Sequence, residues 1–372
     1  MKYKFIIVGA GITGCVIAER LASRFGEPVL IIENRNHIAG NCHDYRNNQN
    51  ILVHTYGPHI FHTNKEEVWK YLSQFTSWEE YEHNVLANID GKLVNIPFNL
   101  NSIQKCFPES LAHNLEKKLL SNYKYGEKIP ILELKNTQDK DLQFLATYVY
   151  EKVFLGYTIK QWDMDPSELD SSVMNRIPFF ISKDDRYFSD KYQALPKNGY
   201  TELCTNILNH NKNIHLLLST NFCDVKNYLK YDMLIFTGKI DNYFDYKFGE
   251  LPYRDLYFEF LNYEIDEFQP VAQVNYPCNN NFTRITEFKH FYKTRTFGTT
   301  IAKEYSLKHD ASVSYSPYYP VLTQESLILY EKYKTETAKT KNVIFCGRLG
   351  DYKYYNMDEA VHRALEIGNN LI

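Results

Sequence analysis

A glycine-rich turn stands between two apolar runs within the first forty residues. Residues 5–8 are FIIV, an unbroken apolar run typical of a parallel strand buried on both faces. GAGITG follows at residues 9–14, and residues 15–25 then place apolar side chains on one helical stripe. A second apolar run, VLII at residues 29–32, ends in Glu33. This order restricts the start of the chain to a strand, helix and strand of a parallel sheet.

The spacing G-x-G-x-x-G in this context predicts a dinucleotide site. Gly9 permits the tight turn, Gly11 lets the backbone approach a pyrophosphate, and Gly14 lets the helix pack closely on the strand. The N–H groups and partial positive charge at the helix start favour phosphate, and the residues there are Ile12 and Thr13. A glycine-rich turn without a ligand is the alternative.

The residues after the second strand favour FAD over NAD. Glu33 is expected to bind the ribose hydroxyls, and an acid there argues against the 2′-phosphate of NADP. Arg35 stands two residues later, and a second glycine turn with Gly40 and Asn41 is typical of the flavin side of FAD sites. An NAD domain would more often continue with further β-α repeats, whereas residues 54–63 are histidine-rich and irregular.

The end of the chain repeats the same pattern. Residues 342–346 predict a buried strand, 347–350 a glycine turn and 359–371 a helix. A further helix and two strands of the same sheet are predicted at residues 200–208, 214–218 and 233–238. We therefore expect an α/β fold with a discontinuous, Rossmann-like FAD-binding domain.

The intervening segments predict two other kinds of structure. Residues 119–165 favour helices, and residues 241–334 hold short aromatic and β-branched runs typical of an antiparallel sheet. We predict an FAD-binding domain of residues 1–80, 197–240 and 335–372, a helical domain with a mobile lid at 100–180, and an antiparallel-sheet substrate domain of residues 81–99, 181–196 and 241–334.

Charge and cysteine usage exclude several classes of protein. The chain has 42 basic and 45 acidic residues, a net charge of −3, which argues against a general nucleic-acid binder. The seven cysteines form no C-x-x-C pair, so neither a zinc site nor a redox pair is indicated. The first residues lack the features of a signal peptide, and no run approaches the ~18 apolar residues of a membrane helix. We expect a soluble, cytoplasmic protein with no membrane partner.

The segment GPHIFHT at residues 57–63 places two histidines three apart. His59 and His62 could be metal ligands, a catalytic pair or parts of a tight turn. A zinc site would need a third ligand, and His54 gives the spacing H-x4-H-x2-H, which matches no standard site. We therefore expect no metal.

Motifs along almost the whole chain resemble those of the bacterial UDP-galactopyranose mutases. In order they are GAGITG (9–14), GPHIFHT (57–63), GYTIKQW (156–162), DDRYFSDKYQALPKNGY (184–200), FTRITEFKHF (282–291), PYYP (317–320) and GRLGDYKYYNMD (347–358). That family uses reduced FAD to interconvert UDP-galactopyranose and UDP-galactofuranose. Its members are usually cytoplasmic homodimers that supply furanose units for cell-surface polysaccharides. The resemblance implies the same activity, cofactor and assembly here.

The resemblance also implies an anion site. Arg176 and Arg284 match the arginines that clamp the substrate diphosphate, a task that suits a permanently charged, planar guanidinium. Arg176 lies within residues 165–180, whose proline, serines and acids predict a loop; the family has a mobile lid here that would exclude water. Both arginines are expected to act in catalysis by stabilising the charge of the departing UDP.

The remaining family positions fall into substrate and cofactor groups. Tyr157 matches the residue that stacks on uracil, Trp162 one that lines the sugar pocket, and Asn84 one on the nucleotide side. Three tyrosines match hydrogen-bond donors to the diphosphate, although any one of them could be a core residue: Tyr187, Tyr319 and Tyr354. The flavin is expected to contact His59, His62, Gly347, Arg348, Tyr354, Met357 and Asp358. His59 is a further candidate for facing C2 of the sugar.

Two residues depart from the family pattern. The family usually has two glycines before Asn41, and the first is replaced by Ala39, which should be tolerated if its φ is negative. The family tends to carry an aspartate where Asn356 stands. If that side chain contacts a sugar hydroxyl, the asparagine keeps a hydrogen-bond acceptor and loses the charge.

The implied mechanism needs no nucleophile from the protein. N5 of reduced FAD attacks the anomeric carbon and expels UDP, and the sugar ring opens and recloses through its 4-hydroxyl. Three alternatives stay open: the same ring contraction on UDP-N-acetylgalactosamine, a flavin oxidase of the amine-oxidase type, and a non-catalytic FAD or nucleotide sensor. An oxidase would need an apolar cage over the flavin, and a sensor need not keep Arg176, Arg284 and the lid.

Overall fold

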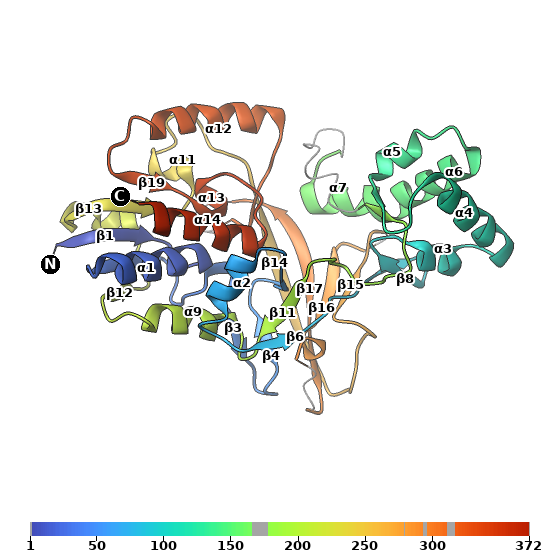
Figure 1. Ribbon diagram of the computed structural model, residues 1–372, viewed down its shortest axis with the longest axis horizontal. Coiled ribbons are helices and arrows are strands. Elements are labelled where there is room, and N and C mark those ends of the chain that lie inside the picture. Colours follow the sequence, from blue (N-terminus) through green and yellow to red (C-terminus); the bar gives the residue numbers. More distant parts are fainter. Residues whose placement is uncertain (1, 166–177, 279, 293–295, 311–316, 372) are drawn as a thin grey trace.

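The computed structural model describes residues 2–165, 178–278, 280–292, 296–310 and 317–371 (Figure 1). A parallel sheet with its helices forms one end of the molecule, and a group of helices forms the other. A long antiparallel sheet lies between them. Arg176 and the lid predicted around it fall outside the described residues.

The parallel sheet collects strands from four separate parts of the chain. Its order is β12 (Ile214–Leu217), β2 (Val29–Ile32), β1 (Tyr3–Val8), β13 (Tyr231–Phe236) and β19 (Val343–Phe345). All four neighbouring pairs are parallel. The apolar runs at residues 5–8, 29–32 and 233–236 therefore lie in the three central strands, whereas those at 214–218 and 342–346 form the two edge strands. The central strands are buried on both faces as parallel strands require.

Helices cover both faces of this sheet. One face packs on α1 (Ile12–Phe25), α9 (Tyr200–Asn209) and α14 (Met357–Asn370), and its core includes Ile7, Ile31 and Ile235. The opposite core holds Ile6, Leu30 and Leu234 together with Phe222 of α10 (Phe222–Val225). Short helices α11 (Ile240–Tyr243) and α13 (Gly347–Gly350) follow β13 and β19.

The antiparallel sheet has seven strands and extends away from the parallel sheet (Figure 1). Their order is β18 (Tyr319–Pro320), β14 (Tyr253–Tyr263), β17 (Thr299–Lys308), β16 (Arg284–Glu287), β15 (Gln273–Asn275), β7 (Val85–Ile89) and β8 (Lys92–Ile96). Every pair is antiparallel except β15 with β7.

One segment predicted as part of this sheet is a helix. Residues Gln324–Thr337 form α12, and a capping box between Thr323 and Ser326 begins it. The prediction of sheet up to residue 334 was wrong here because the segment's apolar residues form no clear stripe, so its periodicity gave no helical signal.

The helical part has its own hydrophobic core. It comprises α3 (Leu100–Cys106), α4 (Glu109–Asn122), α5 (Ile131–Lys135), α6 (Lys140–Val149), a π-helical segment (Tyr150–Leu155) and α7 (Gly156–Trp162). Helix α7 returns toward the antiparallel sheet at Gly156, where a Cβ would lie 2.4 Å from the carbonyl oxygen of Pro277. Strands β9 (Lys128–Ile129) and β10 (Phe179–Phe180) pair with each other and contribute Ile129 and Phe179 to this core.

Smaller sheets connect these parts beneath the parallel sheet. Strands β5 (Phe61–Thr63), β11 (Tyr192–Pro196) and β6 (Trp78–Glu80) form one, and β3 (Asp44–Arg46) with β4 (Leu52–His54) another; α2 (Glu66–Leu72) follows β5. Asp44 is buried, and its carboxylate accepts hydrogen bonds from the N–H groups of Tyr200 and Thr201 at 2.6 and 2.9 Å. It thereby satisfies the first N–H groups of α9. Over the described ranges, no helix is both long and apolar enough to cross a membrane.

Candidate cofactor and substrate site

A cavity of about 650 Å3 opens at the carboxyl ends of the parallel strands. Its wall includes the residues that directly follow three strands: Gly9 after β1, Glu33 after β2 and Thr237 after β13. This is the edge where open α/β sheets bind their ligands. The wall continues onto the antiparallel sheet through Arg284 and Glu304, so one cavity joins the two sheets.

The three glycines of the first turn have different surroundings. Gly9 has φ +104°, and a Cβ there would lie 2.2 Å from Thr237 Oγ1. A Cβ at Gly14 would lie 2.0 Å from the carbonyl oxygen of Gly9, so helix α1 can pack here only without a side chain. A Cβ at Gly11 would meet nothing closer than Gly40 Cα at 3.9 Å. Gly9 and Gly14 are thus required by the fold, while Gly11 keeps the cavity wall open at the helix start.

Glu33 ties the first turn to the segment after β2. Its buried carboxylate accepts hydrogen bonds from the N–H groups of Ala10 and Arg35 at 2.8 and 2.9 Å. Arg35 in turn donates to Asn41 Oδ1 at 2.9 Å and lies over the ring of Tyr56. Each carboxylate oxygen can accept a second hydrogen bond, so Glu33 remains able to bind a ribose hydroxyl.

The second glycine turn touches the first, and this corrects one expectation. Ala39 has φ +71°, in the left-handed region, so the condition of a negative φ is not met. Its N–H donates to the carbonyl of Ala10 at 2.9 Å, and a Cβ at Gly40 would lie 2.9 Å from Gly11 Cα. Contact between the two turns forces this backbone, and the alanine bears a strain of about 1–2 kcal/mol.

Arg284 places a permanent positive charge in the cavity. On β16 it stands opposite Glu304 of β17, and the two form an ion pair with Nε 2.8 Å from Oε2. Burial lowers the pKa of Arg284, the charge of Glu304 raises it, and the net shift is upward. The guanidinium side chain is 19% exposed and the Glu304 side chain 2%. The arginine therefore stays charged and keeps part of its surface available to an anion.

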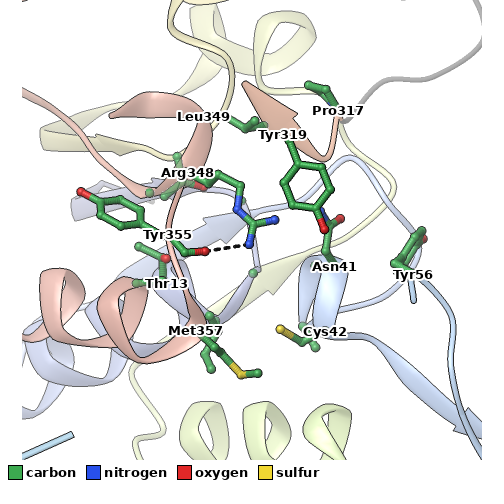
Figure 2. A pocket seen from close by; sticks show the side chains of 18 of the residues that line it. Thr13, Asn41, Cys42, Tyr56, Pro317, Tyr319, Arg348, Leu349, Tyr355 and Met357 are labelled. Carbon is green, nitrogen blue, oxygen red and sulfur yellow. Dashed lines mark hydrogen bonds between the residues drawn. The ribbon is translucent and has the colours of Figure 1, made fainter. Parts of the chain in front are cut away.

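Two tyrosines and a second arginine form a stack on the cavity wall. The rings of Tyr319 and Tyr354 lie parallel with centroids 4.9 Å apart. The Arg348 guanidinium lies 5.1 Å from the Tyr319 ring and donates to the carbonyl oxygen of Tyr355 at 3.0 Å (Figure 2). It also donates to the carbonyl oxygen of Tyr318 at 3.1 Å. Burial raises the pKa of Tyr319, so its hydroxyl remains a hydrogen-bond donor.

The cavity contains most, but not all, of the residues predicted for the site. The predicted residues on its wall are Gly9, Gly11, Ile12, Thr13, Glu33, Arg35, Gly40, Asn41, His59, His62, Tyr187, Arg284, Tyr319, Gly347, Arg348, Tyr354, Asn356 and Met357. Five described residues of the predicted site are not on the wall: Gly14, Asn84, Tyr157, Trp162 and Asp358.

The residues away from the wall have other contacts. Tyr157 and Trp162 lie on α7, and the Trp162 ring is 6.4 Å from the rings of Tyr319 and Tyr354. Helix α7 thus stands next to the tyrosine stack. Asp358 accepts a hydrogen bond from Thr63 Oγ1 at 2.9 Å, which fixes α14 to β5.

The two histidines of GPHIFHT have different hydrogen-bond partners. His59 Nδ1 donates to the carbonyl of Gly57 at 2.8 Å, and its backbone N–H donates to His54 Nδ1 at 3.0 Å. Burial lowers the pKa of His54 and of His59 to about 3, so both rings are neutral. His62 lies 2.9 Å from a carboxylate oxygen of Asp190. Within the described segments, no three His, Cys, Asp or Glu side chains are arranged to hold a metal.

Sequence reasoning missed Glu304 and Asp190, which hold Arg284 and His62 respectively. Each pair is joined across neighbouring strands or at a strand end, in β16–β17 and in β5–β11. Opposite charges on facing strands can be recognised as partners only when the strand register is known. The sequence alone does not give that register.

Comparison with known proteins agrees with this arrangement. A family model described as UDP-galactopyranose mutase matches residues 152–354, and one described as an NAD(P)-binding Rossmann-like domain matches residues 7–75. A Klebsiella pneumoniae protein named probable UDP-galactopyranose mutase is 38% identical, over 99% of this chain and 94% of its own. An Escherichia coli dTDP-fucopyranose mutase is 35% identical, over 98% of this chain and 97% of its own.

Solved structures agree on the fold. A crystal structure of reduced UDP-galactopyranose mutase matches with a TM-score of 0.75 at 16% identity, covering 100% of this chain and 94% of that one. A putrescine oxidase variant matches with a TM-score of 0.57 at 9% identity, over 100% and 99% of the two chains. The predicted fold class, with its discontinuous Rossmann-like domain, is confirmed. By the extent of its family match and of its identity to the Klebsiella relative, the chain belongs to the UDP-galactopyranose mutase family, as its motifs predicted.

Proposed function

We propose that the protein is a flavin-dependent mutase that interconverts UDP-galactopyranose and UDP-galactofuranose. The observation that carries this proposal is one cavity with two halves of different chemistry. One half is a glycine cradle for a dinucleotide at the ends of β1 and β2. The other half holds the charged Arg284 and the paired Tyr319 and Tyr354 rings, which suit a diphosphate.

FAD is the cofactor that we propose for the cradle. The open wall at Gly11, the start of α1 and the carboxylate of Glu33 fit its pyrophosphate and ribose. The cavity continues past these residues to Arg348 and Met357, which leaves room for a flavin beyond the adenosine half. Reduced flavin, when bound, supplies the nucleophile that displaces UDP from the anomeric carbon.

The protein's own residues then bind and orient the sugar nucleotide. Arg284 is proposed to hold the diphosphate and to stabilise the charge that develops on UDP. Tyr187, Tyr319 and Tyr354 are proposed to donate hydrogen bonds to it without adding charge. Tyr157 and Trp162 would receive the nucleoside and the sugar from α7, and Asn84 the nucleotide side. Arg176 is proposed as the second clamp, from the segment outside the described residues.

This chemistry argues against the oxidase and sensor alternatives. An amine-oxidase-type site needs an apolar cage, whereas this cavity has Arg284 and its partner Glu304 on the wall. A sensor of the cofactor alone would have no need to bury an ion pair that keeps an arginine charged beside it. We therefore propose an enzyme, with the cytoplasmic location and homodimeric assembly expected from the family resemblance.

A second substrate is favoured by one specific observation. The dTDP-fucopyranose mutase matches over nearly the same length and at nearly the same identity as the first relative. dTDP-fucopyranose carries thymine, a 2-deoxyribose and a 6-deoxy sugar, and it presents the same diphosphate. Asn356, on the cavity wall, stands where the family tends to carry an acid, so sugar selection here can differ from the family norm.

Turnover of a panel of furanose nucleotides tests the proposal. Purified, FAD-loaded protein is incubated with UDP-galactofuranose, dTDP-fucofuranose or UDP-N-acetylgalactosaminofuranose, with and without dithionite, and the products are separated by chromatography. Conversion of UDP-galactofuranose only in the reduced sample is expected. Faster conversion of either other nucleotide reassigns the substrate. No conversion of any of them, with UDP binding intact, overturns the mutase proposal.

A further inference from the structure

Lys160 donates hydrogen bonds to three backbone carbonyl oxygens of a single loop. It lies on α7, and the loop joins β15 to β16, just before Arg284. The acceptors are Tyr276, Asn280 and Phe282, the last two at 3.1 and 3.4 Å. An ammonium has three N–H donors and a neutral amine only two, so donation to all three carbonyls requires the charged form of the lysine.

These carbonyls are the partners that a buried cation needs. Lys160 is only partly exposed, and burial lowers the pKa of its ammonium. The carbonyl oxygens take the place of water molecules that the charge would otherwise bind. A side chain of similar length without N–H groups would leave the carbonyl oxygens of the loop without these donors. The hydrogen bonds of Lys160 therefore hold the β15–β16 loop to α7.

A second contact holds the same loop at the start of α7. A Cβ at Gly156 would lie 2.4 Å from the carbonyl oxygen of Pro277, so helix and loop meet here backbone to backbone. The Cys278 thiol donates to the carbonyl oxygen of Lys152 at 3.5 Å, in the π-helical segment before α7. The loop thus contacts the helical chain at positions 152, 156 and 160.

The face of α7 that carries Lys160 also carries Tyr157. Residues three apart lie on one face of a helix, so the two side chains share the face next to the loop. Burial raises the pKa of the Tyr157 phenol, and the positive charge of Arg284 lowers it. Tyr157 on the helix and Arg284 on the strand therefore lie within electrostatic reach of each other. Lys160 links the helix that bears the first to the loop that leads to the second.

We propose that Lys160 is a positioning residue that sets the place of Tyr157 relative to Arg284 by fixing α7 to the β15–β16 loop. This inference rests on the proposed function, in which Tyr157 receives the nucleoside and Arg284 the diphosphate. Both groups belong to one nucleotide, so both contacts form together only if the helix and the strand keep one separation. Lys160 acts through this separation and not by touching the nucleotide or the flavin.

Lys160→Met removes the N–H groups and keeps most of the length of the side chain. The loop carbonyls lose their donor, and α7 is no longer fixed to the loop at this point. We expect the Kd of UDP and the KM of the sugar nucleotide to rise about tenfold, while kcat of the reduced, FAD-loaded protein stays within about threefold. Contacts to the nucleoside are equal in the ground and transition states, so their loss appears in KM.

A neighbouring lysine provides the matched control. Lys152 lies in the π-helical segment before α7, and its ammonium pairs with Asp90 at 3.0 Å. Lys152→Met therefore removes the same group and the same charge from the same helical region without touching the loop carbonyls. The Kd of UDP should change by less than about twofold in this variant, because a partly exposed ion pair contributes little.

A double-mutant cycle tests the route of the effect. If Lys160 acts by placing the Tyr157 ring, Lys160→Met should weaken UDP binding about tenfold in the parent and less than about twofold in protein that already carries Tyr157→Ala. Calorimetry with UDP gives the four affinities on FAD-loaded protein, and the Kd of FAD should be the same in all four.

Chemical rescue separates the hydrogen bonds from a general loss of structure. Lys160→Ala leaves a space beside the carbonyl oxygens that n-propylammonium matches, since it has the atoms of lysine beyond Cβ. Added n-propylammonium should restore most of the UDP affinity of Lys160→Ala and have no effect on the parent. Tetramethylammonium at the same concentration has the same charge and no N–H group, so it should restore nothing.

Three results would overturn the inference: equal losses of UDP affinity in Lys160→Met and Lys152→Met, a full loss in the Tyr157→Ala background, or equal rescue by the two ammonium ions. If the reduced parent converts none of the nucleotides but binds UDP, the proposed function fails, and the cycle still decides the role of Lys160. A parent that does not bind UDP overturns both proposals.

Discussion

Gly14 and Gly11 of the first turn should separate the needs of the fold from those of the cofactor. In Gly14→Ala, the added Cβ would lie 2.0 Å from the carbonyl oxygen of Gly9, whereas ordinary contact begins at 3.4 Å. Both groups belong to the backbone of one strand, turn and helix, so no side-chain rotation relieves the overlap. Overpacking at such a site costs up to about 3 kcal/mol, and the helix propensity of alanine offsets about 1 kcal/mol. We expect the free energy of unfolding to fall by about 2 kcal/mol.

Gly11→Ala should fold and bind the cofactor poorly. The nearest heavy atom to its Cβ would be Gly40 Cα at 3.9 Å, and its φ of −69° suits any residue. Only the N-cap preference for glycine over alanine is lost, at less than about 1 kcal/mol. The methyl group would stand where the backbone is expected to approach the pyrophosphate. We expect the Kd of FAD to rise at least about tenfold, equivalent to about 1.4 kcal/mol.

The assay compares both variants as apoproteins. Urea unfolding gives the stability of each, and quenching of FAD fluorescence gives the Kd. The reasoning is refuted if Gly11→Ala destabilises the apoprotein as much as Gly14→Ala, or if it binds FAD with the affinity of the parent. Either result would mean that Gly11 serves packing and that the cradle lies elsewhere on the cavity wall.

Three further predictions use the electrostatics and strain of the site. Arg284→Lys should weaken UDP binding by at least about tenfold in calorimetry, because an ammonium lacks the guanidinium fork; unchanged affinity would remove Arg284 from the anion site. The pKa of His54 is about 3 in the folded protein and ~6.5 in the unfolded chain. The unfolded chain therefore binds a proton at this residue first as the pH falls, so the free energy of unfolding is unaffected by His54 above pH 6.5 and decreases as the pH falls from 6.5 toward 3. His54→Asn should therefore reduce the slope of stability against pH between 5 and 6 by about 1.4 kcal/mol per unit in urea unfolding, and an unaltered slope would contradict this. Ala39→Gly should relieve about 1–2 kcal/mol of backbone strain, while the greater freedom of glycine in the unfolded chain costs about 0.4–1 kcal/mol. Urea unfolding should therefore show no loss of stability in Ala39→Gly. Ala39→Val should be clearly less stable than the parent.

Local signals were enough for the cofactor half of the fold. Strand β2 begins and ends where the apolar run predicts, and α1 begins three residues before its predicted start. Here the apolar runs, the glycine turn and the helix stripe all lie within forty residues and agree with one another. The same holds for β19 and α14 at the other end of the chain.

Strand pairing, one backbone conformation and the partners of two side chains depend on contacts between distant parts of the chain, so they could not be predicted from the sequence. The parallel pairing of β15 with β7 joins residues 273–275 to 85–87, and nothing in either segment specifies the other. The positive φ of Ala39 follows from contact between two turns that are adjacent only in space. The partners of Arg284 and His62 depend on strand register in the same way. The motifs thus predicted many of the side chains that line the cavity, and packing decided which neighbours they contact.

Residue 356 can change between asparagine and aspartate without a cost in stability, so it can alter ligand selection alone. It is the N-cap of α14, and its N–H donates to Glu359 at 2.8 Å in a capping box. Asparagine and aspartate are equally good N-caps, so the helix loses nothing when one replaces the other. Asn356 also lies on the cavity wall, where an aspartate would add a negative charge to a site proposed to bind an anionic sugar nucleotide. The exchange is therefore neutral for folding, and its whole effect must appear in the affinity for, or choice among, sugar nucleotides. Asn356→Asp should leave Tm unchanged and alter the relative kcat/KM for the galactose, fucose and acetamido nucleotides; a change in Tm without a change in these ratios would show that position 356 acts only on α14.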